Sequence, residues 1–108
     1  MSISMIQFSY SPEIVAKLIN NPEDRSIAVK NLVEKLGGHM LSFYYSFGDY
    51  DGVIIVEMPD KTSGLATTLS AFAQGGLTNL KTTVLITVEE AIVAMKKASE
   101  LTLEMPKG

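Results

Sequence analysis

Four short segments of the chain carry apolar residues in the alternating or continuous pattern of β-strands. These segments are residues 2–10, 39–47, 53–58 and 80–87. Alternation places successive side chains on opposite faces of a sheet, so a half-buried strand is apolar at every second position. The third segment differs, because it is apolar at every position except Glu57. A strand that is apolar on both faces belongs in the centre of a sheet that is covered on both sides.

A helical region follows the first strand and is interrupted once. Ser11 before Pro12 has the pattern of a cap and a first helical residue, and the pattern returns at Asn21 and Pro22. Proline has no N–H to donate in a helix interior, so the second proline restarts a helix instead of continuing one. The restarted helix ends at Gly37, and its apolar face consists of Ala28, Val29, Leu32, Val33 and Leu36.

Two more helices are predicted in the second half of the chain. Asp60 can cap the first of them, and its buried stripe is expected to consist of Leu65, Leu69, Phe72 and Ala73. Gly75 and Gly76 end this helix. Thr87 followed by Glu90 has the spacing of a capping box and begins the last helix, which carries Ala91, Ile92, Met95 and Ala98.

The turn between the second and third strands fixes which side chains share a face. Residues 48–52 (Gly-Asp-Tyr-Asp-Gly) have the composition of a hairpin turn. A two-residue loop at 49–50 or at 51–52 gives the same assignment of faces. One face then carries His39, Leu41, Phe43, Tyr45, Phe47, Ile54, Val56 and Met58, and the other carries Ser42, Tyr44, Ser46, Val53, Ile55 and Glu57.

The resulting order is βαββαβ followed by a further helix. Right-handed crossovers turn this order into a split βαβ sheet with its helices on one face, which is the ferredoxin-like α+β fold. We expect one domain over residues 1–100 and a C-terminal tail over residues 101–108. Within one chain nothing covers the second face of the sheet. The protein is therefore expected to be a homo-oligomer, either a dimer or a multiple of dimers.

Composition narrows the classes of partner. The chain has 108 residues, enough for one domain, and its 46% apolar content is that of a globular protein. The net charge of −3 argues against binding a nucleic-acid backbone, which requires clustered Lys and Arg side chains. The apolar runs of the chain, such as residues 53–56, are far too short to cross a membrane. With no signal-peptide pattern in residues 1–10 and no cysteine, a cytoplasmic location is expected.

Several of these segments together resemble the GYD domain family. The resemblance rests on residues 34–38 (Glu-Lys-Leu-Gly-Gly), 48–51 (Gly-Asp-Tyr-Asp) and 56–60 (Val-Glu-Met-Pro-Asp), and it extends from about Ile6 to Glu90. It implies a dimeric α/β barrel, in which two ferredoxin-like sheets pack face to face. Related barrel families include cofactor-independent monooxygenases, haem-degrading enzymes, lactone isomerases and ligand-sensing regulatory domains. The fold alone therefore does not indicate which function applies.

Aromatic residues of the second strand are the first candidates for a binding site. Tyr44 and Tyr45 each combine an apolar ring with a hydroxyl group, which suits the wall of a small-molecule cavity. Core packing or dimer contact explains these two tyrosines equally well. The same structural explanation is the better one for Phe43 and Phe47.

Glu57 is the next candidate, because it interrupts an apolar central strand. A buried carboxylate needs a charged or hydrogen-bonding partner. Lys81 on the fourth strand is one candidate for that partner; the alternative is that Glu57 lies near the sheet edge in water. Gln7, on the first strand, could donate a hydrogen bond into the same region.

The remaining candidates have simple structural explanations. His39 is the only histidine and could act as a general base or a haem ligand, but exposed histidines are common at a strand entrance. Asp49 and Asp51 could bind a cation, yet Asp side chains in turns bond to their own backbone. One histidine and no cysteine argue against a zinc site. No cofactor is expected.

Three functions remain open at this point. The first is a non-catalytic or regulatory module that binds a small, partly apolar molecule between sheet and helices; its ligand-binding candidates are Tyr44, Tyr45, Glu57, Gln7 and Lys81. The second is a cofactor-independent monooxygenase or isomerase for a small aromatic or lactone substrate, with His39 or Glu57 moving protons. The third is a structural oligomer whose own side chains fill the cavity. Binding ranks first, because the sequence contains no coherent catalytic set.

Overall fold

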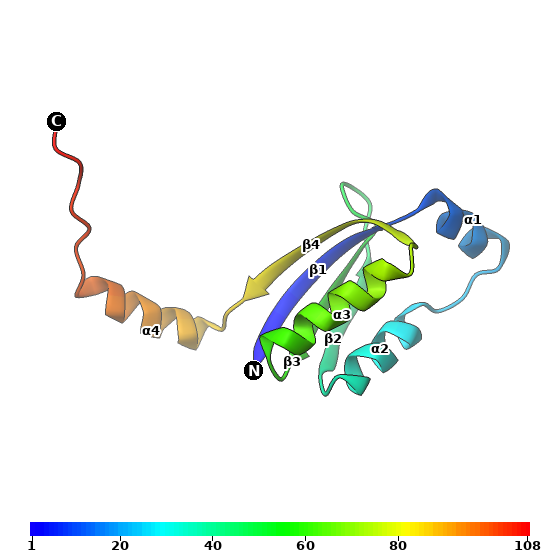
Figure 1. Ribbon diagram of the computed structural model, residues 1–108, viewed down its shortest axis with the longest axis horizontal. Helices are drawn as coiled ribbons and strands as arrows, with labels where there is room; N and C mark the ends of the chain where they lie inside the picture. The colour runs from blue at the N-terminus through cyan, green and yellow to red at the C-terminus, as the bar shows by residue number, and fades with distance from the viewer.

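The computed structural model describes residues 1–108 and contains one antiparallel sheet with helices α2 and α3 on one of its faces and α1 beyond one end of the strands (Figure 1). The strands are β1 (Ser2–Tyr10), β2 (His39–Tyr45), β3 (Gly52–Met58) and β4 (Leu77–Leu85), in the spatial order β2-β3-β1-β4. The helices are α1 (Pro12–Asn20), α2 (Ser26–Lys35), α3 (Lys61–Ala73) and α4 (Val88–Ser99). This is the α+β, ferredoxin-like arrangement that the sequence predicts.

The two central strands, β1 and β3, supply most of the core. Ile6 pairs with Ile54 and Phe8 with Gly52, and all four residues are buried on the face that carries the helices. The core cluster consists of Ile6, Phe8, Val33, Ile54, Val56 and Met58. The alternate side chains of β3 are partly exposed on the opposite face, which we call the open face; they are Val53, Ile55 and Glu57.

The β2–β3 hairpin has the predicted faces but a longer loop. Tyr45 pairs with Gly52 and lies on the helix-covered face, whereas Tyr44 pairs with Val53 and lies on the open face. The loop comprises residues 47–50, in place of the predicted two residues. Loops of two and of four residues place the same side chains of β2 and β3 on a common face. The predicted faces are therefore confirmed, although the predicted residue pairs are not.

A β-bulge near the start of β2 changes the position of His39. The register shifts between Met40 and Ser42, which leaves one β2 residue unpaired. Met40 therefore packs against the core, and His39 lies opposite Glu57 on the open face. Strict alternation placed His39 and Phe43 on the same face of the sheet. That prediction was wrong, because the bulge exchanges the two faces for the residues that precede it.

Capping residues begin three helices where the sequence predicts. Ser11 caps α1, and the Asp60 carboxylate caps α3 by accepting a hydrogen bond from the Ser63 N–H at 2.7 Å. Thr87 and Glu90 form the predicted capping box of α4. None of the helices combines the length and apolar character needed to cross a bilayer.

The second helix begins later than the Asn21–Pro22 pattern predicts. Asp24 Oδ1 accepts a hydrogen bond from the Ser26 N–H at 2.9 Å, and α2 starts at Ser26. Asp24 therefore ends a loop that separates α1 from α2. Arg25 occupies the N-cap position of α2, next to the covered face of the sheet.

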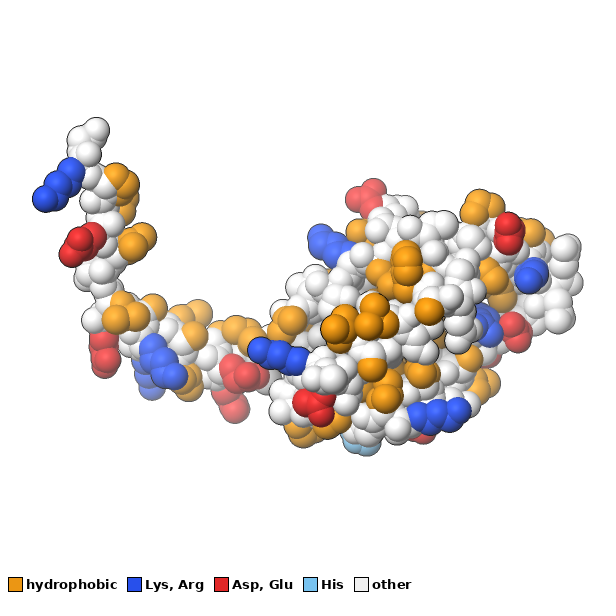
Figure 2. All heavy atoms as spheres, viewed as in Figure 1, with side chains coloured by type: hydrophobic (Ala, Val, Ile, Leu, Met, Phe, Trp, Pro, Cys, Tyr) orange, Lys and Arg blue, Asp and Glu red, His pale blue; other side chains and the backbone are white.

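The face of α3 that contacts the sheet consists of small residues and not of the predicted large apolar ones. Thr67 is buried and Gly64 half-buried, whereas Leu65, Leu69 and Phe72 are 59%, 59% and 47% exposed. The Thr67 hydroxyl donates to a carbonyl one turn earlier, so its burial leaves no polar group without a partner. The stripe prediction was wrong because it weighed hydrophobicity and ignored how closely small residues allow the helix to approach. Figure 2 shows hydrophobic side chains gathered over α3 on its outer side.

α4 projects away from the sheet. Figure 1 shows α4 and the residues after it extending to one side of the other elements, and no α4 residue is buried. The molecule is consequently 60 Å long, with a radius of gyration of 17.9 Å. A compact chain of this length would have a radius of gyration of about 13 Å.

Candidate ligand-binding site

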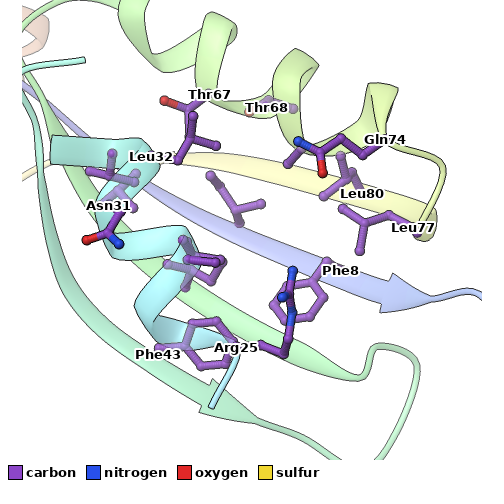
Figure 3. A pocket seen from close by; sticks show the side chains of 18 of the residues that line it. Phe8, Arg25, Asn31, Leu32, Phe43, Thr67, Thr68, Gln74, Leu77 and Leu80 are labelled. Atoms are coloured by element: carbon purple, nitrogen blue, oxygen red, sulfur yellow. The ribbon is translucent and has the colours of Figure 1, made fainter. Parts of the chain in front are cut away.

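A cavity of about 400 Å³ lies between the covered face of the sheet and helices α2 and α3 (Figure 3). This volume is in the range of cavities that hold small molecules. Fourteen of the 21 residues that line it are hydrophobic, and the sheet supplies its floor with Ile6, Phe8, Phe43, Ile54 and Val56. The floor is therefore drawn largely from the strand residues that make the core.

The walls of the cavity come from α2, α3 and the start of β4. Asn31 and Leu32 of α2 stand on one side, Thr67 and Thr68 of α3 on another (Figure 3). Gln74, just after α3, and Leu77 and Leu80 of β4 complete the lining. The lining contains no histidine, aspartate, glutamate or cysteine. The cavity is thus built for burial of apolar groups and lacks the residues most often used for proton transfer.

Arg25 brings a positive charge to the cavity. Its side chain extends from the start of α2 and lines the cavity (Figure 3). Arg25 Nη1 lies 3.4 Å from Glu23 Oε1, and the two side chains are 40% and 57% exposed. An ion pair this exposed contributes little free energy, because water screens it. Another anion can therefore replace Glu23 at small cost.

Tyr10 adds a hydroxyl group near the same charge. Its ring lies 5.2 Å from that of Phe8 and 6.4 Å from that of Tyr45, centroid to centroid. Burial of the ring, and then the adjacent Tyr45 side chain, raise the pKa of Tyr10 far above its ordinary range, although the charge of Arg25 opposes the shift. Tyr10 therefore remains a neutral hydrogen-bond donor at every physiological pH.

Asp51 holds the β2–β3 loop against the end of β1. Its Oδ2 accepts a hydrogen bond from the Tyr10 N–H at 2.9 Å, and its own N–H donates to the Phe8 carbonyl at 2.8 Å. The aspartate thus has a structural role, as turn chemistry predicts. Its partner was wrongly expected to be its own backbone, since the bond reaches a strand 41 residues away.

Of the predicted ligand-binding residues, only Tyr45 stands beside the cavity. Its ring centroid lies 5.4 Å from that of Phe43, a lining residue, although Tyr45 itself does not line the cavity. The other predicted residues lie on the open face; they are Tyr44, Glu57, Gln7 and Lys81. Side chains on opposite faces of a sheet do not reach the same cavity. These four residues therefore do not belong to the cavity between sheet and helices.

On the open face the strand registers hold Glu57 away from Lys81, its predicted partner, and place it opposite His39. Lys81 pairs with Gln7, whereas Glu57 pairs with Ile3 on the same strand, β1. Gln7 and Ile3 are about 13 Å apart along β1, so Lys81 is not the partner of Glu57. His39 is the residue opposite Glu57 on the neighbouring strand β2. From this face neither His39 nor Glu57 can transfer a proton to a molecule in the cavity.

None of the polar residues that line the cavity was predicted from the sequence, and Tyr10 and Arg25 are the two most important of these. Tyr10 had a usable signal, because it follows Ile6 and Phe8 at every second position of β1. The same alternation places all three on the covered face. Arg25 had no such signal, since it lies at the end of a loop whose course no periodicity fixes.

Comparisons with known proteins agree with the fold. The sequence model of the GYD domain family, described as "GYD domain", matches residues 5–95. No protein with a curated description matches the chain. The crystal structure of a protein from Thermus thermophilus is similar, with a TM-score of 0.54, 15% identity and coverage of 82% of this chain and 96% of that one. An uncharacterised NIPSNAP-like domain protein from Burkholderia xenovorans has a TM-score of 0.47, 14% identity and coverage of 81% and 84%. At these identities the likeness concerns the fold alone.

Proposed function

We propose that this chain, which belongs to the GYD domain family, binds a small, mostly apolar molecule with an acidic group between its sheet and helices α2 and α3. We propose further that it does so as a homo-oligomer whose protomers pair through the open face of the sheet. One observation carries the binding proposal. The lining of an apolar cavity of about 400 Å³ includes the cation Arg25, whose ion pair with Glu23 is exposed and exchangeable.

The apolar lining limits the ligand to a short chain or a small ring system. Each methylene group that leaves water contributes about 0.8 kcal/mol. A chain of roughly six to eight carbons therefore gains several kcal/mol, from which the cost of association is subtracted. Threonine, asparagine and glutamine side chains in the walls leave room for a few hydrogen bonds as well; they are Thr67, Thr68, Asn31 and Gln74.

The acidic group follows from Arg25 and Tyr10. A guanidinium group matches the geometry of a carboxylate and can donate two parallel hydrogen bonds to it. A ligand carboxylate would take the place of the exposed Glu23 partner, and Tyr10, which also lines the cavity, offers a neutral hydroxyl as a further donor. The ligand class is therefore a small apolar carboxylic acid.

Exposed surface supports the homo-oligomer. One chain exposes 8138 Å². Roughly 5,900 Å² is usual for a monomer of this mass, so the excess is roughly 2,200 Å². The open face of the sheet carries a row of partly exposed apolar side chains, namely Ile3, Met5, Val53, Ile55 and Leu85. A surface of this kind normally packs against a partner.

Sedimentation equilibrium tests this pairing. We expect a mass that is an even multiple of the 11.7 kDa chain. The physical reason is that pairing two open faces removes their apolar side chains from water. A chain that stays monomeric at micromolar concentration would contradict the homo-oligomer proposal and would leave the cavity proposal to be judged by itself.

Isothermal titration with octanoate and 1-octanol tests the ligand class. Both have the same apolar chain, so both should bind, and octanoate should bind more tightly because only it carries a charge for Arg25. Substitution Arg25→Gln should weaken octanoate binding about tenfold or more, because a hydrogen bond to a charged group contributes about 1.5–3 kcal/mol. The same substitution should leave octanol binding almost unchanged.

Lys30→Gln is the matched control, because Lys30 is an exposed cation of α2 that does not line the cavity. It should bind octanoate as the wild type does. Equal octanoate affinities for the wild type and Arg25→Gln would refute recognition of the acid by Arg25, the cation on which the proposal rests, even though Lys35 also lines the cavity. Failure of both octanoate and octanol to bind would refute a ligand cavity of this class.

A further inference from the structure

We infer that α4 is a pairing helix that packs antiparallel against the α4 of a second copy of this chain. The interface differs from the open face of the sheet and does not depend on the ligand proposed above. It concerns the one element that makes little contact with the rest of its own protomer, as Figure 1 shows.

α4 needs a partner to be stable. It has 12 residues, none buried, and an isolated helix of that length is only marginally stable in water. Its capping box and its first-turn acids favour a helix but do not remove apolar surface from water. Val88, Ile92 and Met95 are 76%, 45% and 66% exposed in one protomer. These side chains are the surface that a partner would cover.

The spacing of the apolar residues suits a two-helix seam. Val88, Ile92 and Met95 follow one another at intervals of four and three, which is the interval of a coiled-coil core. Ala91 and Ala98 lie along one side of this seam and are small enough to let two backbones approach closely. In an antiparallel pair, Ile92 of each copy lies level with Met95 of the other.

Charge selects the antiparallel direction and a second copy. Glu89 and Lys96 lie seven residues apart on the other side of the seam, acid near the helix start and base near its end. Antiparallel packing places Glu89 of each copy near Lys96 of the other. Parallel packing would instead turn this charged side toward Ala91 and Ala98 of the partner, where no opposite charge is available. The alternative is that α4 packs on the exposed apolar side chains of α3. Helix α3 contains no acidic residue to pair with Lys96.

The expected area indicates how such a pair would act. Two helices of this length bury less than the roughly 1,200 Å² of a stable, specific interface. The α4 pair therefore strengthens or extends an assembly that has another contact as well. Loss of the α4 pair should lower the average mass at a given concentration without unfolding the protomer.

Ile92→Glu and Val93→Glu provide the matched test by sedimentation equilibrium. Both residues are exposed in one protomer, at 45% and 53%, but only Ile92 lies on the seam. Ile92→Glu should raise the dissociation constant of the assembly at least tenfold, and Val93→Glu should leave it within about twofold of the wild type. At a concentration where the wild type is assembled, circular dichroism should show wild-type helix content for Val93→Glu. Ile92→Glu should lose helix signal from α4 only, because α4 without its partner is marginally stable.

Equal masses for Ile92→Glu and the wild type would overturn the α4 pair while leaving pairing through the open face intact. A wild-type monomer would overturn both interfaces. If the two glutamate variants lowered the mass equally, a general effect of added charge would explain the loss, and the seam would be refuted.

Cross-linking tests the direction of the pair. The chain has no cysteine, so Glu89→Cys and Lys96→Cys introduce unique thiols. A short bismaleimide added to a mixture of the two variants should join position 89 to position 96 more efficiently than it joins either position to itself. Equal yields of all three products would refute the antiparallel arrangement.

Discussion

Substitution of Phe8 by alanine is expected to lower the free energy of unfolding by about 3–5 kcal/mol. Phe8 is 3% exposed on the central strand β1, and its ring packs against Tyr10 and Phe43 at centroid distances of 5.2 and 5.8 Å. The substitution removes a buried ring and its aromatic contacts. It also enlarges the neighbouring cavity, because the sheet below cannot move to fill the space.

Phe47→Ala is the matched control for this prediction. Phe47 is fully exposed, at 107%, in the loop between β2 and β3. Its loss should change the free energy of unfolding by less than about 0.5 kcal/mol. Urea denaturation of both variants provides the measurement. Similar effects of the two substitutions would show that Phe8 is not the centre of the core.

Gly52→Ala is expected to be the second most damaging of these substitutions, at about 1–3 kcal/mol or more. A Cβ atom on Gly52 would overlap the ring of Phe8, which is buried and cannot turn away. Gly64→Ala is the control, because its Cβ would lie an ordinary 3.7 Å from Met58 Cγ. This second substitution should increase stability by up to about 1 kcal/mol, since alanine favours a helix more than glycine does.

A double-mutant cycle links these two predictions. In the Phe8→Ala/Gly52→Ala double variant, the new methyl group at position 52 enters space that the ring has left. The loss of stability should therefore be clearly smaller than the sum of the two single losses, because the residues are in direct contact. Strict additivity would contradict the predicted overlap between them.

Alternation predicted the fold of this chain well where strands are regular. The range of β1 and the two faces of the β2–β3 hairpin were predicted correctly, and the even loop length preserved those faces even though the loop is longer. The position of His39 was not predictable, because a bulge inserts one residue without any marker in the sequence. Leu65, Leu69 and Phe72 of α3 were misplaced because small residues, and not the most apolar ones, contact the sheet.

The residues that line the cavity were predicted less well than the fold, and for a physical reason. The sequence shows that a strand contains a tyrosine or a glutamate, but the face of the sheet on which that side chain lies depends on the strand register. Tyr44 and Glu57 therefore lie on the open face although their residue types suit a site. Arg25 depends on the end of an irregular loop, and only the three-dimensional arrangement places it at the cavity.

The Gly-Asp-Tyr-Asp segment of this chain has a structural role that the structure explains. Its last aspartate, Asp51, binds the Tyr10 backbone and so fixes the end of β1. Tyr10 and Arg25 both line the cavity. The segment thus positions one end of the proposed binding site without contacting a ligand itself.

A titration of ¹⁵N-labelled protein with octanoate, followed by two-dimensional NMR, tests the central proposal most directly. The proposal predicts that amide shifts change for residues around the cavity, such as Asn31, Thr67 and Gln74, and reach saturation. Amides remote from the cavity, such as those of Ala94 and Lys97 in the projecting helix α4, should stay unchanged. Saturable changes confined to the open face, or no saturable change at all, would contradict ligand binding between the sheet and helices α2 and α3.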